Sequence, residues 1–438
     1  MEHFYKSAYN IIKMHDEKLL LLNTLKGSFV GIDGKLKDDA VRKLENPNTI
    51  INQKLFNILL DNGFIVCGSV NEKDLLDKLR NGFIKNNALN LIMFTTEKCN
   101  FRCKYCYENF EGASMTEEVQ SSTIEFVRNN IGKYKSFHIH WFGGEPLLTV
   151  DIIESMSKQL KQICRENHVL YMAGITTNGY NLTPQNIEIL KECGVYRYQF
   201  TVDGLCDTHD RQRVLFNGGG TWSAIINNLK YLRDNIKSGL LSVSIRTNLT
   251  KEIFDQREEY IDFIMQEFGA DKRFAIEFGL AADFGMVQDK EIIGHFCTKQ
   301  QLFETIVCAL NKNVRSQNIE SLISPGGLLC HAWRDNTFSV RPDGTIGKCT
   351  INLYKQINKI GNIKKNEEGF YSSYWDAGAA GMPDMCKACV KYPICLKVDC
   401  KMPTHRECGN EIQYLEQFLP NICKPQYGYK TITEEMIF

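Results

Sequence analysis

Strand-like and helix-like segments alternate through the middle of this chain, between residues 87 and 290, and this alternation limits the fold more than any other feature. Apolar runs suited to buried strands recur at intervals of roughly 30 to 45 residues, and each interval has room for a helix. The six predicted strands are Leu89–Thr96, Phe137–Phe142, Tyr171–Thr177, Tyr198–Val202, Ser242–Leu249 and Phe274–Gly279.

Helix signals occupy the intervals between these strands. Val119, Ile124 and Val127 form an apolar stripe at helical spacing, and Thr183-Pro184 supplies an N-cap residue followed by proline at the first helical position. Repeated strand–helix units predict an α/β fold in which a parallel sheet forms a partial (β/α)6 barrel, with functional residues at the carboxyl ends of the strands.

Residues 1–86 are predicted to form a separate module. Three strand-like runs precede two helical stretches and a returning strand, an order that predicts a winged helix-turn-helix-like domain. The runs are Tyr9–Met14, Leu19–Asn23, Ser28–Ile32, Leu36–Leu44, Asn52–Asp61 and Phe64–Val66. The hairpin of this module has an edge available for strand addition. We expect three domains, over residues 1–86, 87–300 and 301–438.

The composition excludes several classes of partner. Lysine plus arginine and aspartate plus glutamate both number 52, which predicts no nucleic-acid or anionic-membrane partner. No run of 18 apolar residues occurs, and the first residues do not resemble a signal peptide. In such a chain, 17 cysteines point to metal binding rather than disulfides. We therefore expect a cytoplasmic protein.

Three cysteines follow the first barrel strand directly. Cys99, Cys103 and Cys106 form a C-x3-C-x2-C triplet. Cluster irons are normally held by four thiolates, so a triplet predicts an iron-sulfur cluster with one iron open to a ligand that is not protein. The alternative is zinc, but zinc sites usually pair two C-x2-C knuckles or add histidines at set spacing.

This triplet, with an aromatic residue (Tyr105) before its third cysteine, resembles the signature of the radical S-adenosylmethionine (radical SAM) enzymes. The resemblance implies that Cys99, Cys103 and Cys106 hold a 4Fe-4S cluster whose open iron is chelated by the amino and carboxylate groups of SAM. An electron from the cluster would then split SAM and yield a 5'-deoxyadenosyl radical, which takes a hydrogen atom from the substrate. Tyr105 is expected beside SAM.

Two further segments look like SAM-binding elements of this family. Gly143-Gly144-Glu145-Pro146 follows the second strand and resembles the GGEP motif, which would contact the SAM amino group. Its alternative is a purely structural turn, because glycines let two backbones approach closely. Thr177 and Asn178 end the third strand, where polar side chains of this family meet the ribose or carboxylate of SAM.

The segment after the fourth strand resembles the family pattern S-L-D-G...H-D-x-x-R. It contains Asp203 and Arg213, both expected at the SAM site, and Arg213 would clamp a carboxylate with its bidentate fork. The alternative for Arg213 is a surface ion pair with Asp210. No general base can be assigned from the sequence.

The C-terminal third contains a second cysteine pattern. It resembles the SPASM extension of radical SAM peptide-modifying enzymes, which implies two auxiliary 4Fe-4S clusters and three clusters in all. The implied ligands are Cys386, Cys389, Cys395 and Cys408 for the outer cluster and Cys330, Cys349 and Cys400 for the inner one. Four residues, rather than the usual three, separate Cys395 from Cys400, which leaves Cys400 uncertain as a ligand, and Cys423 is a further candidate. A zinc ribbon is the alternative.

Together these resemblances imply an enzyme that matures ribosomally made peptides, similar to thioether (sactipeptide or ranthipeptide) synthases. The N-terminal module would bind the leader of a precursor peptide as an added strand, and the core peptide would receive a thioether, carbon–carbon or carbon–oxygen crosslink. A flavodoxin- or ferredoxin-type protein would donate the electron.

Three rival functions remain open. An anaerobic sulfatase-type maturase would make formylglycine, but it carries an aspartate base after the cysteine that corresponds to Cys349, where Thr350 stands here. A radical SAM enzyme acting on a small molecule is a second rival. A DNA-binding regulator that senses iron is a third, and the neutral composition argues against it.

Two smaller observations complete the sequence analysis. His138 and His140 alternate on a strand, so their side chains share one face, either the barrel interior or the helix layer, and a metal pair there is the alternative to packing or substrate contact. Most of the cysteines outside the motifs are expected to be buried small apolar residues.

Overall fold

The computed structural model describes residues 3–110, 112–283, 287, 290–365, 370, 375–376, 382–397 and 412–437. The chain forms two compact units. The first unit comprises Met1–Ile84, Ser316–Cys330 and Ala380–Phe438, and the second comprises Lys85–Arg315 and His331–Ala379. These units divide the chain differently from the expected domains over 1–86, 87–300 and 301–438, which remain a prediction about functional parts.

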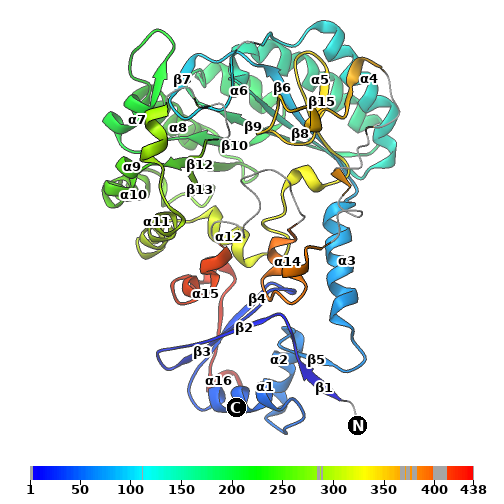
Figure 1. The fold of residues 1–438 in the computed structure, drawn as a ribbon, viewed down its shortest axis with the longest axis vertical. Coiled ribbons are helices and arrows are strands. Elements are labelled where there is room, and N and C mark those ends of the chain that lie inside the picture. Colours follow the sequence, from blue (N-terminus) through cyan, green and yellow to red (C-terminus); the bar gives the residue numbers. More distant parts are fainter. Residues whose placement is uncertain are drawn as a thin grey trace. The chain divides into compact units, whose positions relative to one another are not determined.

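A nine-stranded sheet forms the second unit in the described part of the chain, with the order β13-β12-β10-β9-β8-β6-β14-β15-β16 (Figure 1). Six strands pair in parallel and in chain order, as the sequence predicts. They are β6 (Ala88–Thr96), β8 (Ser136–Gly143), β9 (Leu170–Thr177), β10 (Val195–Thr201), β12 (Ser242–Leu249) and β13 (Phe274–Leu280).

Three short strands extend this sheet beyond β6. The first of them runs parallel to β6 and the other two are antiparallel. They are β14 (Thr337–Val340), β15 (Thr345–Gly347) and β16 (Gly361–Asn362). The sequence analysis predicted no strand in this region, because runs this short carry too little periodicity.

Helices cover the outer face of the sheet (Figure 1). Their starts follow local capping chemistry, since the Thr116 side chain accepts from the Val119 amide and the Thr183 side chain accepts from the Asn186 amide. The helices are α4 (Glu117–Asn130), α5 (Val150–Glu166), α6 (Pro184–Glu192), α7 (Cys206–Gln212), α8 (Trp222–Asn235), α9 (Lys251–Asp255), α10 (Arg257–Phe268) and α11 (Lys299–Asn311).

The two faces of the sheet differ in polarity. On β8, Phe137, Ile139 and Trp141 are buried, whereas His138 and His140 are half-buried on the opposite face. The two histidines therefore share a face, as predicted, and that face is the barrel interior. Alternation of this kind follows from the two-residue period of a strand.

The first unit contains a smaller sheet with the order β17-β4-β3-β2. Its strands are β2 (Asn10–His15), β3 (Lys18–Asn23), β4 (Ser28–Ile32) and β17 (Lys430–Ile432). A core that includes Leu21, Val30 and Ile432 joins this sheet to its helices. The other elements of the unit are β1 (Phe4–Lys6), α1 (Leu36–Glu45), α2 (Gln53–Asp61), β5 (Ile65–Cys67), α3 (Glu72–Ile84), α12 (Gln317–Ile323), α14 (Tyr392–Cys395), α15 (Leu415–Phe418) and α16 (Glu434–Ile437).

Strand β17 extends the small sheet beyond the third predicted strand, Ser28–Ile32. It pairs in parallel with β4, so that edge is occupied by the chain itself. Among the described strands, β2 is the outer strand left at the other edge, where Ile12 and Met14 are 41% and 50% exposed. Local sequence patterns do not report pairing between segments so far apart, which is why β17 was missed.

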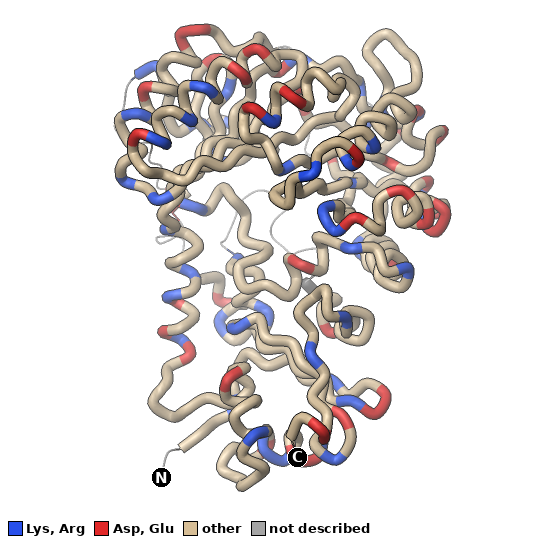
Figure 2. The backbone as a smooth tube through the Cα atoms, turned by 180° about the vertical axis from the view of Figure 1, so that it is seen from behind, with Lys and Arg blue, Asp and Glu red and all other residues tan. Residues whose placement is uncertain are grey.

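Charged residues of both signs are interspersed along the helices of each unit (Figure 2). This distribution agrees with the equal numbers of acidic and basic residues. A bilayer-spanning helix needs a long apolar stretch. None of the helices in the described ranges has one.

Candidate active site

The three cysteines of the triplet line one cavity of about 480 Å³ at the carboxyl ends of the barrel strands. The Phe101 amide donates to the Cys99 sulfur at 3.3 Å, a contact that would stabilise a cluster-bound thiolate. Burial raises the pKa of all three thiols, Cys99, Cys103 and Cys106. In the part of the chain that the structure describes, no three Cys, His, Asp or Glu side chains are grouped as ligands of a single metal ion.

A two-stranded ribbon supports the triplet. Strand β7 (Phe101–Cys103) pairs antiparallel with β11 (Arg213–Leu215), and Cys103 lies directly opposite Arg213. The ribbon thus holds the cysteine loop against the segment that the sequence analysis assigned to SAM binding. Two motifs 108 residues apart in sequence contribute to one cavity, since Arg213 also donates to the Tyr105 hydroxyl.

The glycine pair of the GGEP motif packs against the backbone just before the triplet. A Cβ atom on Gly143 would lie 2.2 Å from the Thr96 carbonyl oxygen, and one on Gly144 would lie 2.3 Å from that of Lys98. Gly143 also has a φ of +129°, which disfavours residues with side chains. The structural-turn interpretation therefore accounts for both glycines, and their contact with SAM stays a prediction.

Glu145 joins the ends of β8 and β9. Its buried carboxylate accepts from the Leu147 amide at 2.9 Å, the Asn178 amide at 2.7 Å and the Thr177 hydroxyl at 2.6 Å. Burial raises the pKa of this carboxyl, although the same hydrogen bonds oppose the rise. Three predicted site residues, Glu145, Thr177 and Asn178, are thus in direct contact.

Tyr105, Asp203 and Arg213 form a second buried cluster at the same cavity. The Tyr105 hydroxyl donates to Asp203 and accepts from an Arg213 amine at 2.7 Å, and Arg213 lies 3.5 Å from the Asp203 carboxylate. Burial raises the pKa of Asp203, and the charge of Arg213 acts against this. Asn248, which the sequence analysis missed, donates its side-chain amide to Tyr105 at 3.1 Å and its backbone amide to Asp203 at 2.7 Å.

The proposed pairing of Arg213 with Asp210 at the surface is wrong. Arg213 is buried, and Asp210 instead accepts from the Thr221 amide at 2.7 Å and the Trp222 amide at 2.8 Å, which stabilises the start of α8. The Nε atom of Arg213 is buried and has no hydrogen-bond partner among the described residues. That atom remains available to a ligand.

Glu108 is a cavity residue that the sequence analysis missed. Its side chain is buried beside the triplet, and burial, with the charges of Glu97 and Glu145, raises its pKa to about 8. Nothing periodic distinguishes this residue in the sequence. Its position two residues after Cys106 was the only available signal.

The auxiliary-cluster cysteines are described only in part. Cys349 follows β15 in the second unit, where its sulfur accepts from the Asn352 amide at 3.5 Å. Cys386, Cys389 and Cys395 lie near one another in sequence around α14 in the first unit, which also contains the exposed Cys330. Cys400 and Cys408 lie outside the described residues. The predicted ligand sets therefore remain predictions.

The remaining cysteines are partly as expected. Cys164, Cys193 and Cys297 are buried. The others are only half-buried, namely Cys67, Cys206, Cys308 and Cys423. The Cys423 thiol donates to the Leu419 carbonyl at 3.2 Å.

Comparison with known proteins identifies the barrel. The sequence profile of the radical SAM superfamily matches residues 93–264. The radical SAM cyclopropyl synthase TigE of Paramaledivibacter caminithermalis is 24% identical over 291 residues, which cover 58% of this chain and 59% of TigE. The chain thus matches less than two thirds of that relative.

Two solved structures resemble the fold more completely. The structure of anSMEcpe with bound AdoMet and the Kp18Cys peptide superimposes with a TM-score of 0.61 at 17% identity, covering 78% of this chain and 98% of that one. The structure of Streptococcus suis SuiB bound to precursor peptide SuiA superimposes with a TM-score of 0.51 at 16% identity. The match covers 93% of this chain and 98% of SuiB.

Residues 93–264, which include the cysteine triplet and most of the barrel strands, are thus similar to the radical SAM superfamily. The fold of the chain is similar to the folds of anSMEcpe and SuiB.

Proposed function

We propose that this enzyme matures a ribosomally made precursor peptide by installing a thioether, carbon–carbon or carbon–oxygen crosslink. The observation that supports this most directly is the shape of the barrel interior. The cavity at the triplet has a second cavity beside it on the inner face, and the two share five lining residues, Phe142, Thr176, Gln199, His331 and Thr350. Two neighbouring cavities suit a peptide substrate, since one could hold the reacting side chain near the triplet and the other could hold a neighbouring part of the peptide.

The residues around the first cavity fit the expected cofactors. Cys99, Cys103 and Cys106 would hold a 4Fe-4S cluster, and the free Nε of Arg213 suits a carboxylate such as that of SAM. The remaining SAM contacts would come from Tyr105, Gly143, Gly144, Glu145, Thr177, Asn178 and Asp203. When bound, the cluster and SAM supply the radical that removes a hydrogen atom from the substrate.

The chain itself fixes the geometry of this site. Glu145 holds Thr177 and Asn178 at the end of β9, and Asp203 orients Tyr105 and Arg213. Because these groups are buried and already hydrogen-bonded, they need little rearrangement when a ligand enters.

Thr350 favours crosslinking over formylglycine formation. It lines both cavities, at the place where a sulfatase-type maturase would carry its aspartate base. Glu108 is the carboxylate present among the described residues that line the two cavities. It comes from the triplet loop rather than from the segment after Cys349.

We further propose that the C-terminal cysteines hold two auxiliary 4Fe-4S clusters. Cys386, Cys389, Cys395 and Cys408 would bind the outer cluster, and Cys330, Cys349 and Cys400 the inner one. The resemblance to the SPASM pattern supports this assignment. Iron analysis should give about twelve iron atoms per chain for three clusters, whereas zinc in the purified protein would support the ribbon alternative.

A flavodoxin- or ferredoxin-type donor would dock at the cysteine loop. Lys98 precedes the triplet, and Arg102 and Lys104 lie between its cysteines. The Arg102 guanidinium lies 4.4 Å from the Phe110 ring and 4.5 Å from the ring of Phe216, which is 69% exposed. Cations around an exposed aromatic ring suit an acidic partner protein.

Leader recognition is assigned to the N-terminal winged-helix-like region. Because β17 occupies the β4 edge, we place the added leader strand at β2. Truncating residues 1–86 would remove the sheet on which β17 packs, so point variants are the sharper test. Ile12→Glu and Met14→Glu should lower peptide modification at least about tenfold, while SAM cleavage without peptide stays unchanged.

The function as a whole is tested with candidate precursor peptides, taken from any short reading frames found next to the gene. The reconstituted enzyme, dithionite and SAM should yield a peptide lighter by two hydrogen atoms, with the linked residues located by fragmentation. Trapping with a hydrazide distinguishes the rival, since formylglycine carries an aldehyde and a crosslink does not. Leu240→Glu, an exposed apolar site outside the small sheet, is the matched control for the β2 variants.

A further inference from the structure

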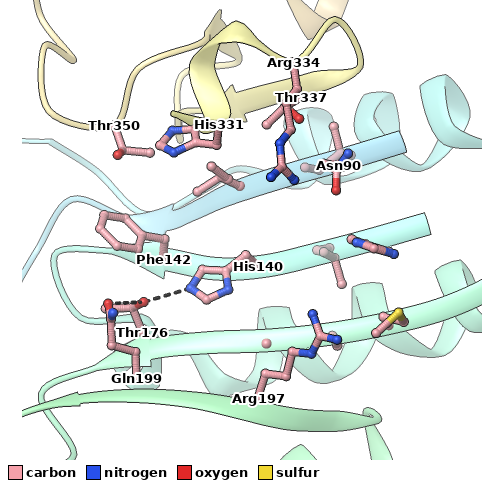
Figure 3. A pocket seen from close by; sticks show the side chains of 17 residues that line it. Asn90, His140, Phe142, Thr176, Arg197, Gln199, His331, Arg334, Thr337 and Thr350 are labelled. Carbon is pink, nitrogen blue, oxygen red and sulfur yellow. Dashed lines mark hydrogen bonds between the residues drawn. The ribbon is translucent and has the colours of Figure 1, made fainter. Parts of the chain in front are cut away.

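The second cavity lies on the barrel's inner face and has a volume of about 400 Å³ (Figure 3). Its lining differs in charge from that of the first. Two arginines and three histidines line it, and no described lining residue is acidic. They are Arg197, Arg334, His138, His140 and His331.

Gly174 creates part of this space. In the parallel register it lies between His140 on β8 and Arg197 on β10. A Cβ atom at this position would come within 2.9 Å of the His140 Nδ1 atom and 3.2 Å of the Arg197 Cβ atom. A glycine here therefore lets an imidazole and a guanidinium side chain stand side by side on the cavity wall.

The arginine on this wall differs from its neighbour on the next strand. Arg246 on β12 forms an ion pair with Glu277 at 2.6 Å, whereas Arg197 on β10 has no acidic partner among the described residues. Arg197 is an exposed residue that also lines this cavity, so its solvated guanidinium offers positive charge to a ligand that enters.

Neutral donors and acceptors surround this cation. His140 contacts the Thr176 hydroxyl at 2.8 Å through Nε2, and Thr176 reaches Gln199 at 3.3 Å (Figure 3). Burial lowers the pKa of His140 to about 4, and the charges of His331 and Arg197 add to this effect. At neutral pH the imidazole is uncharged, so the positive charge of the wall comes from the arginines.

We infer that this cavity binds a carboxylate of the substrate, with Arg197 as its charged partner and His140 as a neutral hydrogen-bonding partner. A guanidinium and a carboxylate match in charge and in planar geometry. The assignment deepens the proposed function and rests on it for one step, namely that the carboxylate belongs to a peptide. Its source is either an aspartate or glutamate side chain or the C-terminal carboxylate of the peptide.

Small probes test this without any peptide processing. N-acetylglutamate N-methylamide carries a side-chain carboxylate, N-acetylalanine carries only a terminal one, and N-acetylglutamine N-methylamide carries neither. Binding to the reconstituted enzyme is followed by saturation-transfer NMR titration. We expect saturable binding of one carboxylate probe and none of the glutamine probe, and the probe that binds identifies the source.

Two variants locate the site. Arg197→Gln should weaken binding of the carboxylate probe at least about tenfold, since it removes a charge-assisted hydrogen bond. Gly174→Ala keeps the charge but narrows the space and should also weaken binding. Arg128→Gln, which removes an exposed cation from α4 outside the cavity, is the matched control.

Three outcomes overturn the inference: equal binding of the glutamate and glutamine probes, no saturable binding of either carboxylate, or unchanged affinity in both Arg197→Gln and Gly174→Ala. Failure of the proposed function looks different. In that case the carboxylate probe still binds in an Arg197-dependent manner, but no precursor peptide is modified.

Discussion

The two ends of the barrel's inner face differ in how their charged side chains are paired. At the carboxyl ends of the strands, Asp203 and Arg213 are buried and pair with each other and with Tyr105. Farther along the inner face, Arg197 faces a cavity without an acidic partner among the described residues. Charged groups that already pair with one another suit the binding of a constant ligand such as a cofactor. A charged group without an acidic partner suits the recognition of a substrate that varies.

The largest expected effect concerns the cysteine triplet at the carboxyl ends of the strands. Single substitutions Cys99→Ala, Cys103→Ala and Cys106→Ala should each abolish SAM cleavage, because two thiolates hold the cluster too weakly. The measurement is 5'-deoxyadenosine formed with dithionite after anaerobic reconstitution. Cys308→Ala, at a half-buried cysteine on α11, is the control and should retain activity. Wild-type turnover in any triplet variant would contradict the assignment.

The second prediction measures how far the matched charges stabilise the fold. Asp203→Ala leaves Arg213 buried and unpaired, so the free energy of unfolding should fall by about 3 to 5 kcal/mol. Urea denaturation of the reconstituted protein checks this. Asp203→Asn, which keeps the shape and an acceptor for Tyr105, should cost less. If the free energy of unfolding fell by less than about 1 kcal/mol in Asp203→Ala, the ion pair between Asp203 and Arg213 would not stabilise the fold as proposed.

The third prediction concerns how pH changes the stability of the protein through His140, in the second cavity. The pKa of His140 is about 4 in the folded state and about 6.5 when unfolded, so between these values the unfolded chain binds more protons and stability falls as pH is lowered. From pH 7 to pH 5 this single site should remove about 2 kcal/mol.

His140→Gln tests that sign. The variant keeps a hydrogen-bonding side chain beside Thr176 but cannot gain a proton, so its unfolding free energy should depend less on pH than that of the wild type. His331 and Arg197, the two groups that add to the shift, are present in both proteins. Parallel pH dependences in the two proteins would show that the pKa of His140 is not lowered in the folded state.

The smallest expected effect sharpens the contrast between the two arginines. Arg197→Gln breaks no described ion pair and should change the free energy of unfolding by less than about 0.5 kcal/mol. Arg213→Gln should cost several times more, because it leaves Asp203 buried without its partner. If the two substitutions lowered the free energy of unfolding equally, the pairing of Arg213 and Arg197 would not differ as described.

Sequence patterns predicted what depends on local periodicity. The strand Ser242–Leu249 coincides with β12, and His138 and His140 share the inner face, because alternation is encoded residue by residue. Motif order also placed Cys99 and Arg213 in one cavity.

What the sequence did not predict depends on contacts between distant segments. Asp203 meets Tyr105 across 98 positions, and Asn248 joins them from a further strand, so no window of sequence contains the cluster. Burial explains Glu108 in the same way, since the elevated pKa of its carboxyl follows from surroundings that only the folded barrel provides.

Strand β17 also determines when the small sheet can finish folding during synthesis of the chain. Its residue Ile432 belongs to the same core as Val30, so the small sheet lacks one strand and part of its core until the ribosome has reached residue 432. At about 5 to 20 residues per second, roughly 400 residues take about 20 to 80 seconds. During that interval the barrel can fold, and the β4 edge is exposed to chaperones and to other chains.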